Sequence, residues 1–279
     1  MTPFTRCLFP LIAMVIGFIL DLVFGDPEPM PHLISLIGKL ISALEKLLRR
    51  LLPKSVAGER TAGGLLLALI ALICFGVPFG LLMLCYWLTP ILGIAVEALL
   101  CWQIFASKSL RDACMKVYRA LKRGNPERAR KAVSRVVSRD TDALDEAGII
   151  RATVESASKN ICDAGIAPII FTVLGGAPLG LLYRAVNVLD SMVGHVDEPY
   201  KNFGLIPARA DDVLGFIPAR ISALLMLLGG FILNLNVSNG FKIFKRDRRN
   251  HPGPNPGQTQ SVCAGLLGFS LAETRAITA

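Results

Sequence analysis

Apolar residues in the first third of the chain form runs that are long enough to cross a membrane. Residues 65–88 contain no charged side chain, and residues 8–24 contain one, Asp21. A helix needs about 20 apolar residues to span the hydrocarbon core of a bilayer. Pro90 then interrupts the pattern, and residues 91–105 predict a second, shorter span. We expect an N-terminal membrane helix, retained because no small-x-small cleavage site follows it, and then an antiparallel pair of spans.

Residues 33–52 show helical periodicity with two different faces. Apolar side chains recur three or four residues apart, while Lys39, Lys46, Arg49 and Arg50 occupy another side. This pattern predicts a basic amphipathic helix. Two placements are open for it, on the anionic surface of a membrane or against neighbouring helices.

The second half of the chain alternates polar segments with short apolar runs. Asn125 followed by Pro126 predicts the start of a helix in a polar segment. Residues 166–182 and 221–235 are apolar but short for a membrane span. We therefore expect both runs to dip into the membrane or to pack within the protein without crossing.

Positively charged residues indicate which segments face the cytoplasm. Lys and Arg concentrate in residues 25–62, 107–165 and 236–279 and are few in residues 183–216. The positive-inside rule places the first three segments in the cytoplasm. If neither short apolar run crosses, residues 183–216 lie there as well, and this is the arrangement that we expect.

Composition supports a membrane protein. Hydrophobic residues make up 53% of the chain and charged residues 18%, against roughly 45–50% and 25% in soluble domains. The net charge of +9 is typical of basic cytoplasmic loops. No nucleic-acid-binding motif accompanies it, so nucleic acid is not an expected partner. The cysteines form no C-x-x-C pair and no zinc spacing, which argues against a disulfide framework or a metal–thiolate site.

The expected architecture is all-α: a multi-pass integral membrane protein with helical cytoplasmic loops and an amphipathic interfacial helix. We expect residues 1–279 to form one membrane-embedded domain. Residues 1–106 would supply membrane helices and the amphipathic helix. Residues 107–165 would form a helical cytoplasmic segment, and residues 166–279 would add further helices and a basic C-terminal loop.

Polar groups gather between residues 139 and 220, next to apolar segments where such groups are costly to bury. Asp142 is expected to cap a helix that runs to about Cys162, with Asp145 and Glu146 in its first turn. This stretch is therefore where we look for the chemistry.

Two polar stripes run along this helix. Glu155, Lys159 and Asp163 recur at four-residue spacing, and Ser156 and Asn160 form a neighbouring stripe with Asp163. One interpretation is a solvated face with a weak Glu155–Lys159 ion pair. The other is part of a site for Mg²⁺ and phosphate, which needs carboxylates for the metal and cationic or amide donors for phosphate oxygens.

An ordered series of motifs continues through most of the chain. It comprises Asp21, Gly25-Asp26-Pro27, Pro31-His32, Arg139-Asp140-Thr141, Arg151-Ala152, Val154-Glu155, Asn160, Asp163, Ala167-Pro168, Leu174-Gly175-Gly176-Ala177-Pro178, Ala185-Val186-Asn187, Leu189-Asp190-Ser191-Met192-Val193-Gly194, Tyr200, Gly204, Ala208-Arg209, Asp211-Asp212-Val213, Pro218-Ala219-Arg220, Arg246-Asp247-Arg248, Asn250-His251 and Pro254-Asn255. This series resembles the CobD/CbiB family of membrane proteins of cobalamin biosynthesis, the adenosylcobinamide-phosphate synthases.

The resemblance implies an ATP-dependent amide ligase in the cell membrane, with its active face in the cytoplasm. The carboxylate of adenosylcobyric acid would be activated by ATP as an acyl phosphate. The amine of an aminopropanol, in most members its O-phosphate, would then attack. ATP and Mg²⁺ are the implied cofactors. The corrinoid, the aminopropanol, membrane lipid and possible contacts with other cobalamin-pathway membrane proteins are the implied partners.

The resemblance also implies roles for individual side chains. Carboxylates would bind Mg²⁺ or act as the base, and cationic or amide side chains would contact phosphate or carboxylate groups. The expected catalytic residues are Glu155, Asp163, Asp190, Asp211 and Asp212, with Glu155, Asp163 and Asp212 as metal ligands. The expected substrate and phosphate contacts are Arg139, Asn160, Asn187, Lys201, Arg209, Arg220, Arg248, His251 and Asn255.

The chain departs from the family pattern at several positions. Lys159 and Gln260 stand where family members usually carry Glu, and His195 stands where they carry Tyr. The chain also ends at Ala279, before a Gly-Gly-Pro-x-x-Tyr-type segment. A non-catalytic or degenerate paralogue that binds a corrinoid or a protein partner is therefore the alternative.

Overall fold

The computed structural model describes residues 3–26, 32–137, 140–195 and 197–271. The described residues are helical throughout, with turns and loops between the helices and no β-strand. The chain divides into two compact units. Unit 1 comprises Met1–Ala106 and Ala167–Leu214, and unit 2 comprises Ser107–Ile166 and Gly215–Ala279.

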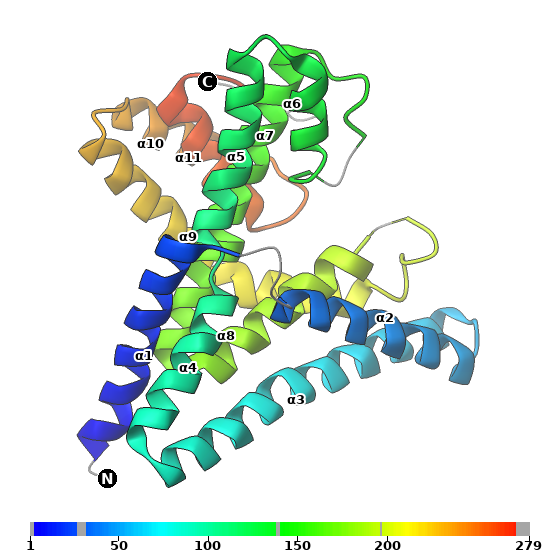
Figure 1. The fold of residues 1–279 in the computed structure, drawn as a ribbon. Helices are drawn as coiled ribbons and strands as arrows, with labels where there is room; N and C mark the ends of the chain where they lie inside the picture. The colour runs from blue at the N-terminus through cyan, green and yellow to red at the C-terminus, as the bar shows by residue number, and fades with distance from the viewer. Residues whose placement is uncertain (1–2, 27–31, 138–139, 196, 272–279) are drawn as a thin grey trace. The chain divides into compact units, whose positions relative to one another are not determined.

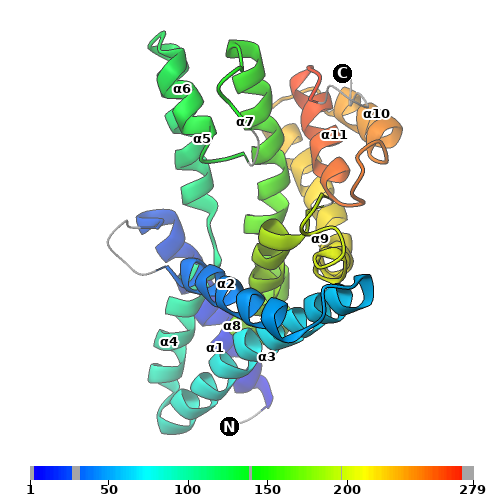
Figure 2. The same ribbon diagram turned by 90° about the vertical axis from the view of Figure 1, so that its right-hand side faces the viewer.

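Unit 1 holds the most apolar helices. Helix α1 (Pro3–Phe24) packs on α4 (Pro90–Ile104), and α3 (Val56–Leu88) packs on α4 and on α8 (Ala167–Val193). Helix α2 (Leu33–Leu51) runs back along the first part of α3 (Figures 1 and 2). The first half of α9 (Leu205–Ile232) completes the unit. Its core includes the fully buried side chains Ile41, Leu66, Ile70, Ile104, Phe105, Leu189 and Phe203.

Unit 2 is built from shorter helices around small cores. Helices α5 (Ser107–Lys122), α6 (Pro126–Val133) and α7 (Glu146–Asn160) enclose one core, and the π-helix η1 (Ile161–Ile166) continues α7. The second half of α9 packs with α10 (Val237–Asp247) and α11 (Pro256–Leu267), and the last two lie side by side (Figure 2). The core side chains of these groups include Val117, Val133, Ile149, Leu227, Phe244 and Val262.

Several helix boundaries predicted from the sequence are confirmed. Thr89 ends α3 and caps α4 through a hydrogen bond from Leu92 N, at the break expected at Pro90. Asn125 caps α6 and accepts from Arg128 N, with Pro126 in the first turn. The amphipathic helix is also confirmed: α2 buries Ile37, Ile41 and Leu48 on one side.

One predicted cap is wrong. Asp145, not Asp142, caps α7, and its Oδ1 accepts a hydrogen bond of 2.7 Å from Gly148 N. The helix therefore begins one turn later than expected. Both residues are good caps by type, and the local sequence does not distinguish them. Residues 141–144 instead form a turn: Leu144 N donates to Thr141 O, and Leu144 O accepts a hydrogen bond of 2.8 Å from Arg130 Nε.

Four helical segments are long and apolar enough to cross a membrane: Val56–Leu88, Pro90–Lys122, Glu146–Val193 and Leu205–Ile232. Leu8–Phe24 is a shorter apolar helix. Many of their large apolar side chains are exposed, for example Leu72, Trp87 and Ile91 at 70%, 78% and 81%. Such apolar exposure fits helices that face lipid, because contiguous apolar surface is unfavourable in water.

Residues 166–182 and 221–235 were expected to be too short to cross a membrane. This expectation is wrong about the length of the helices that contain them. Helices α8 and α9 extend beyond these runs to 27 and 28 residues. Helix α8 is not straight, however. Gly175 and Gly176 have non-helical backbone angles, and its two halves meet at a bend (Figure 1). Length alone therefore does not decide whether α8 crosses.

We expect the protein to sediment with membranes after cell lysis and to require detergent for extraction. The physical reason is the exposed apolar surface of α3, which carries no charged residue between Arg60 and its end at Leu88. Ultracentrifugation followed by an alkaline wash measures this directly. Recovery as a monomer in the supernatant would contradict the membrane assignment.

Candidate functional site

The first polar cluster lies in unit 1, where the end of α8 meets the start of α9. Asn187 Nδ2 donates a hydrogen bond of 3.2 Å to Asp211 Oδ1. Asn187 is 8% exposed, and Asp211 is partly buried. This bond joins two motifs that are 24 residues apart in the sequence. The two predicted site residues are thus brought into direct contact.

Asp190 and Asp212 lie on the same two helices, close in sequence to the bonded pair. Asp190 follows Asn187 by one turn of α8, so the two side chains share a helix face. Its carboxylate lies over Gly194, where an added Cβ would clash with Asp190 Oδ1. Asp212 follows Asp211 and is partly buried, whereas Lys201 and Arg209 are exposed. Gly194 is therefore required for this packing of Asp190.

Arg184 belongs to the same face and was not predicted as a site residue. It precedes Asn187 by three residues on α8 and is only 9% exposed. A buried arginine needs anionic or hydrogen-bonding partners. The signal in the sequence is a single charge within an apolar run, which in a membrane helix indicates function by default.

Glu97 marks a second buried polar site in unit 1. It lies on α4, is 2% exposed, and accepts hydrogen bonds from Tyr86 Oη (2.6 Å) and Ala177 N (3.0 Å). The second bond places the carboxylate at the start of the second half of α8, whose free N–H groups attract negative charge. Gly176, with φ 70° and ψ −171°, makes the close approach possible. The glycine pair thus forms the bend of α8, and Gly176 allows the close approach of Glu97.

The stripe on α7 lies in unit 2 and is partly used for local contacts. Asn160 Nδ2 donates to Ser156 O and Ser156 Oγ, at 3.0 and 3.1 Å. Lys159 Nζ lies 3.9 Å from Asp163 Oδ2, and the Lys159 side chain is 43% exposed. The ion pair therefore joins Lys159 to Asp163, four residues later. Glu155 is half-buried on the same helix.

The π-helix changes the spacing that the sequence predicted. Residues Ile161–Ile166 form η1, so Asp163 lies in a turn wider than the α-helical turn that the predicted spacing assumed. Single π turns inside helices are rare and frequently occur at functional sites. The Asp163 side chain is 14% exposed, and it remains close enough to Lys159 to form an ion pair.

A second group of predicted residues meets in unit 2 around the start of α11. Arg220 Nη1 donates to Asn255 Oδ1 at 3.4 Å, and Asn255 is 8% exposed. Arg248 is close enough to Arg220 to act on it electrostatically. Two guanidinium groups beside a buried amide suit the oxygens of a phosphate or a carboxylate.

The loop before α11 holds this group in place. His251 Nδ1 accepts a hydrogen bond of 2.9 Å from Gly253 N, which makes a tight local turn. Arg246 pairs with the buried carboxylate of Asp247 through two bonds of 2.7 Å. Gln258 Nε2 donates to Arg248 O and Pro254 O. These contacts fix the backbone that carries Arg248 and Asn255.

Comparison with known proteins decides the family. A family model described as "CobD/Cbib protein" matches residues 14–276 of the chain. The chain belongs to the CobD/CbiB family. No solved structure gives a significant match.

Named relatives in this family align over most of the chain. Cobalamin biosynthesis protein CobD of Clostridium perfringens is 44% identical over 261 residues, which cover 94% of this chain and 82% of the relative. CobD of Geobacter metallireducens is 44% identical over 92% of this chain and 79% of its own length. Cobalamin biosynthesis protein CbiB of Salmonella typhimurium is 38% identical over 94% and 82%. Identity of this extent does not favour a degenerate paralogue.

The site residues that the family resemblance implies thus fall in both units. Asn187, Asp190, Asp211 and Asp212 lie in unit 1. Glu155, Asn160, Asp163, Arg220, Arg248, His251 and Asn255 lie in unit 2. Arg139 lies outside the described residues. Within the described part of the chain, no group of three or more His, Cys, Asp and Glu side chains is arranged to hold a metal ion.

Cys263 is a half-buried cysteine of α11 in this CobD/CbiB family member. Burial raises the pKa of the Cys263 thiol to about 11. The thiol is therefore protonated at neutral pH, where only a thiolate would act as a nucleophile or metal ligand.

Proposed function

We propose that this chain is an enzyme of cobalamin biosynthesis that joins adenosylcobyric acid to an aminopropanol or its O-phosphate. The product would be adenosylcobinamide or its phosphate, formed by an ATP-dependent acid–amine ligation. Family membership over residues 14–276 supports the pathway. The observation that carries the site is the Asn187–Asp211 contact, which joins two family motifs in one polar cluster.

The reaction replaces a carboxylate oxygen of the corrinoid with the nitrogen of the amine. The oxygen leaves with a phosphoryl group of ATP, the C–N bond forms, and the amine proton passes to a base. Asp190, Asp211 and Asp212 in unit 1 are the proposed carboxylates for the base and for charge compensation. The hydrogen bond from Asn187 orients the Asp211 carboxylate.

The unit 2 residues are proposed to bind anionic groups. Hydrogen bonds to the phosphate oxygens would come from Arg220, Arg248 and Asn255. These bonds would stabilise the negative charge that develops on the phosphate during phosphoryl transfer. His251 would hold the loop that presents them. Lys201 and Arg209, both exposed in unit 1, are proposed for more peripheral contacts to the substrates.

Mg²⁺ would compensate the phosphate charge when bound. The donor chemistry fits this ion, since carboxylate and amide oxygens are its preferred protein ligands and few are needed because it retains water. Glu155 and Asp163 are the ligands proposed in unit 2, and Asp212 is proposed separately as a ligand in unit 1. Each is partly buried, which strengthens its interaction with a cation relative to open solvent.

The proposed location is the cell membrane, with the active face in the cytoplasm, where ATP is available. The basic residues of segments 25–62, 107–165 and 236–279 support this orientation. Membrane lipid surrounds the helices, and other membrane proteins of the cobalamin pathway are proposed partners. The corrinoid and aminopropanol substrates would enter from the cytoplasm.

Complementation tests the proposed function. The gene should restore adenosylcobinamide phosphate formation in a bacterial strain that lacks its CobD/CbiB enzyme. Extracts of the rescued strain should form the product only with ATP. Failure to rescue, with the protein present in the membrane at wild-type level, would contradict the enzymatic assignment.

Replacing Lys159 with Glu should lower product formation about two- to fivefold, because it creates two like-charge pairs that each cost a few tenths of a kcal/mol. The change places three carboxylates along one helix stripe with Glu155 and Asp163, and like charges four residues apart repel. It also removes the ammonium that lies 3.9 Å from Asp163. Steady-state product formation in membranes measures the effect, alone and combined with Gln260→Glu.

Lys116→Glu is the matched control, because it makes the same charge change at an exposed position of α5 in the same unit. It should leave activity unchanged. A gain of activity in Lys159→Glu would mean instead that a missing metal ligand had been restored. Equal activity in both variants would assign Lys159 to a structural role.

A further inference from the structure

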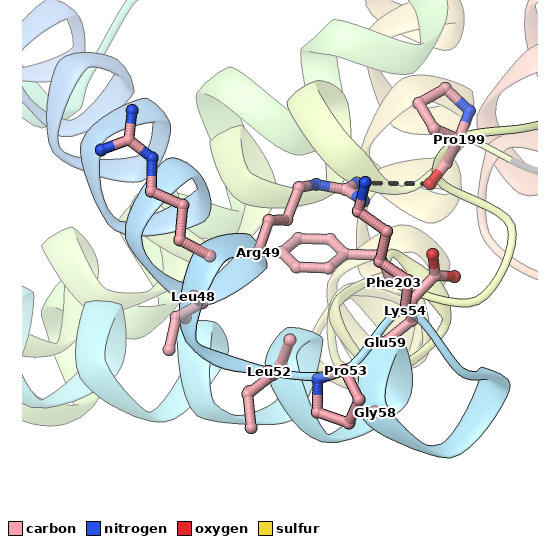
Figure 3. A pocket seen from close by; sticks show the side chains of 11 residues that line it. Leu48, Arg49, Leu52, Pro53, Lys54, Gly58, Glu59, Pro199 and Phe203 are labelled. Atoms are coloured by element: carbon pink, nitrogen blue, oxygen red, sulfur yellow. Dashed lines mark hydrogen bonds between the residues drawn. The ribbon is translucent and has the colours of Figure 1, made fainter.

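A pocket of about 670 Å³ lies in unit 1, where the end of α2 meets the start of α3. Figure 3 shows its lining side chains, which come from these two helices and from the loop between α8 and α9. Apolar side chains such as Leu48 and Phe203 form part of the wall, together with three cations and one carboxylate. None of the residues proposed for the ligase reaction lines it.

One of the cations, Arg49, is already engaged within the protein. Its Nε donates to Glu45 Oε1 at 2.9 Å, and its Nη2 donates to Pro199 O at 3.2 Å (Figure 3). Its guanidinium also lies 4.2 Å from the centre of the Phe203 ring. Arg49 therefore fixes the loop at one side of the pocket.

The other two cations, Arg50 and Lys54, are exposed at the pocket. Neither forms an ion pair with a carboxylate in the part of the chain that the structure describes. Glu59 contributes the single carboxylate of the lining. The pocket thus presents two uncommitted positive charges and one hydrogen-bond acceptor to a ligand.

The pocket lies at the polar end of a candidate membrane span. Glu59 and Arg60 are in the first turns of α3, and no charged residue follows them before its end at Leu88. Beside the pocket, α2 exposes Leu47 and Leu51, at 50% and 70%. Cations next to exposed apolar side chains, at the level where a span becomes polar, match the boundary between lipid headgroups and acyl chains.

We propose that this pocket binds the headgroup of an anionic phospholipid of the phosphatidylglycerol type. Arg50 and Lys54 would bind the phosphate diester, and Glu59 would accept hydrogen bonds from the glycerol hydroxyls. The acyl chains would lie along the exposed leucines of α2. A water-soluble phosphate ester shares the phosphate chemistry, but it would make no use of these leucines.

Lipid titration of the detergent-purified full chain, followed by native mass spectrometry, tests the proposal. Phosphatidylglycerol should bind with a defined stoichiometry, and phosphatidylcholine, whose headgroup has no hydroxyl donor, should bind more weakly. The pair Arg50→Gln/Lys54→Gln should weaken phosphatidylglycerol binding on the order of tenfold or more, because it removes hydrogen bonds between charged partners. Circular dichroism should confirm an unchanged fold.

The matched control is Lys39→Gln/Lys46→Gln, which removes the same charge from exposed positions of α2 outside the pocket. This pair should keep the affinity of the wild type. An equal loss in both pairs would overturn the proposal in favour of general attraction to an anionic surface. Binding of free glycerophosphoglycerol as tight as that of the lipid would overturn it in favour of a soluble phosphate ester.

Discussion

Replacing Gly176 with alanine is expected to destabilise the protein by about 3 kcal/mol or more, because this backbone conformation is essentially restricted to glycine and strain of this kind costs 1–3 kcal/mol. The residue has φ 70° and ψ −171°. An added Cβ would also lie 2.6 Å from Glu97 Oε1. The methyl group would therefore strain the bend of α8 and displace a buried carboxylate from its hydrogen bonds.

Thermal unfolding of the detergent-solubilised protein measures this effect. Gly80→Ala is the matched control, since Gly80 lies in α3 of the same unit and an added Cβ there meets nothing within 4 Å. The control should be neutral or slightly stabilising, because alanine favours a helix. Equal melting temperatures for Gly176→Ala and the wild type would contradict the role of the bend.

Activity should fall with Gly176→Ala even under conditions where the protein remains folded. The second half of α8 begins directly after the bend and carries Asn187 and Asp190. Its orientation depends on the hydrogen bond between Ala177 N and Glu97. A shift of this half would separate Asn187 from Asp211, and product formation in membranes would report the loss.

Replacing Asp163 with asparagine should reduce adenosylcobinamide phosphate formation on the order of 100-fold, as expected when one electrostatic contact to a developing charge is removed. Asp163 is half-buried on the π-helix and pairs with Lys159. The substitution preserves its size but removes the charge that would attract a metal ion. Initial rates at saturating ATP and varied Mg²⁺ measure the effect.

Asp145→Asn is the control within the same helical segment. Asparagine caps a helix as well as aspartate, so the hydrogen bond from Gly148 N to residue 145 is retained. Activity should remain near that of the wild type. The opposite ranking, with a full rate for Asp163→Asn and a lost rate for Asp145→Asn, would place the site elsewhere.

The sequence by itself determined the helices and the family. Residues 65–88, the break at Pro90 and the two faces of α2 are local patterns, and each matches a helix of the structure. The cap at Asn125 followed from residue type and the adjacent Pro126. Such features depend on neighbours within a few residues, which the sequence displays directly.

Only the tertiary structure decided which distant residues meet. The contacts of Asn187 with Asp211 and of Glu97 with Ala177 span 24 and 80 residues. No periodicity predicts them, because they depend on how whole helices pack. The same holds for the two units, since residues 107–166 join residues 215–279 across an intervening segment.

Local competition explains the remaining differences. Asp142 and Asp145 are equivalent as caps by residue type, and the contact of Leu144 O with Arg130 Nε belongs to the turn that precedes the helix starting after Asp145. The π-helix is likewise invisible in a pattern read at regular helical spacing. The pocket at the end of α2 needed three separate segments to come together, so the sequence indicated its basic helix but not its walls.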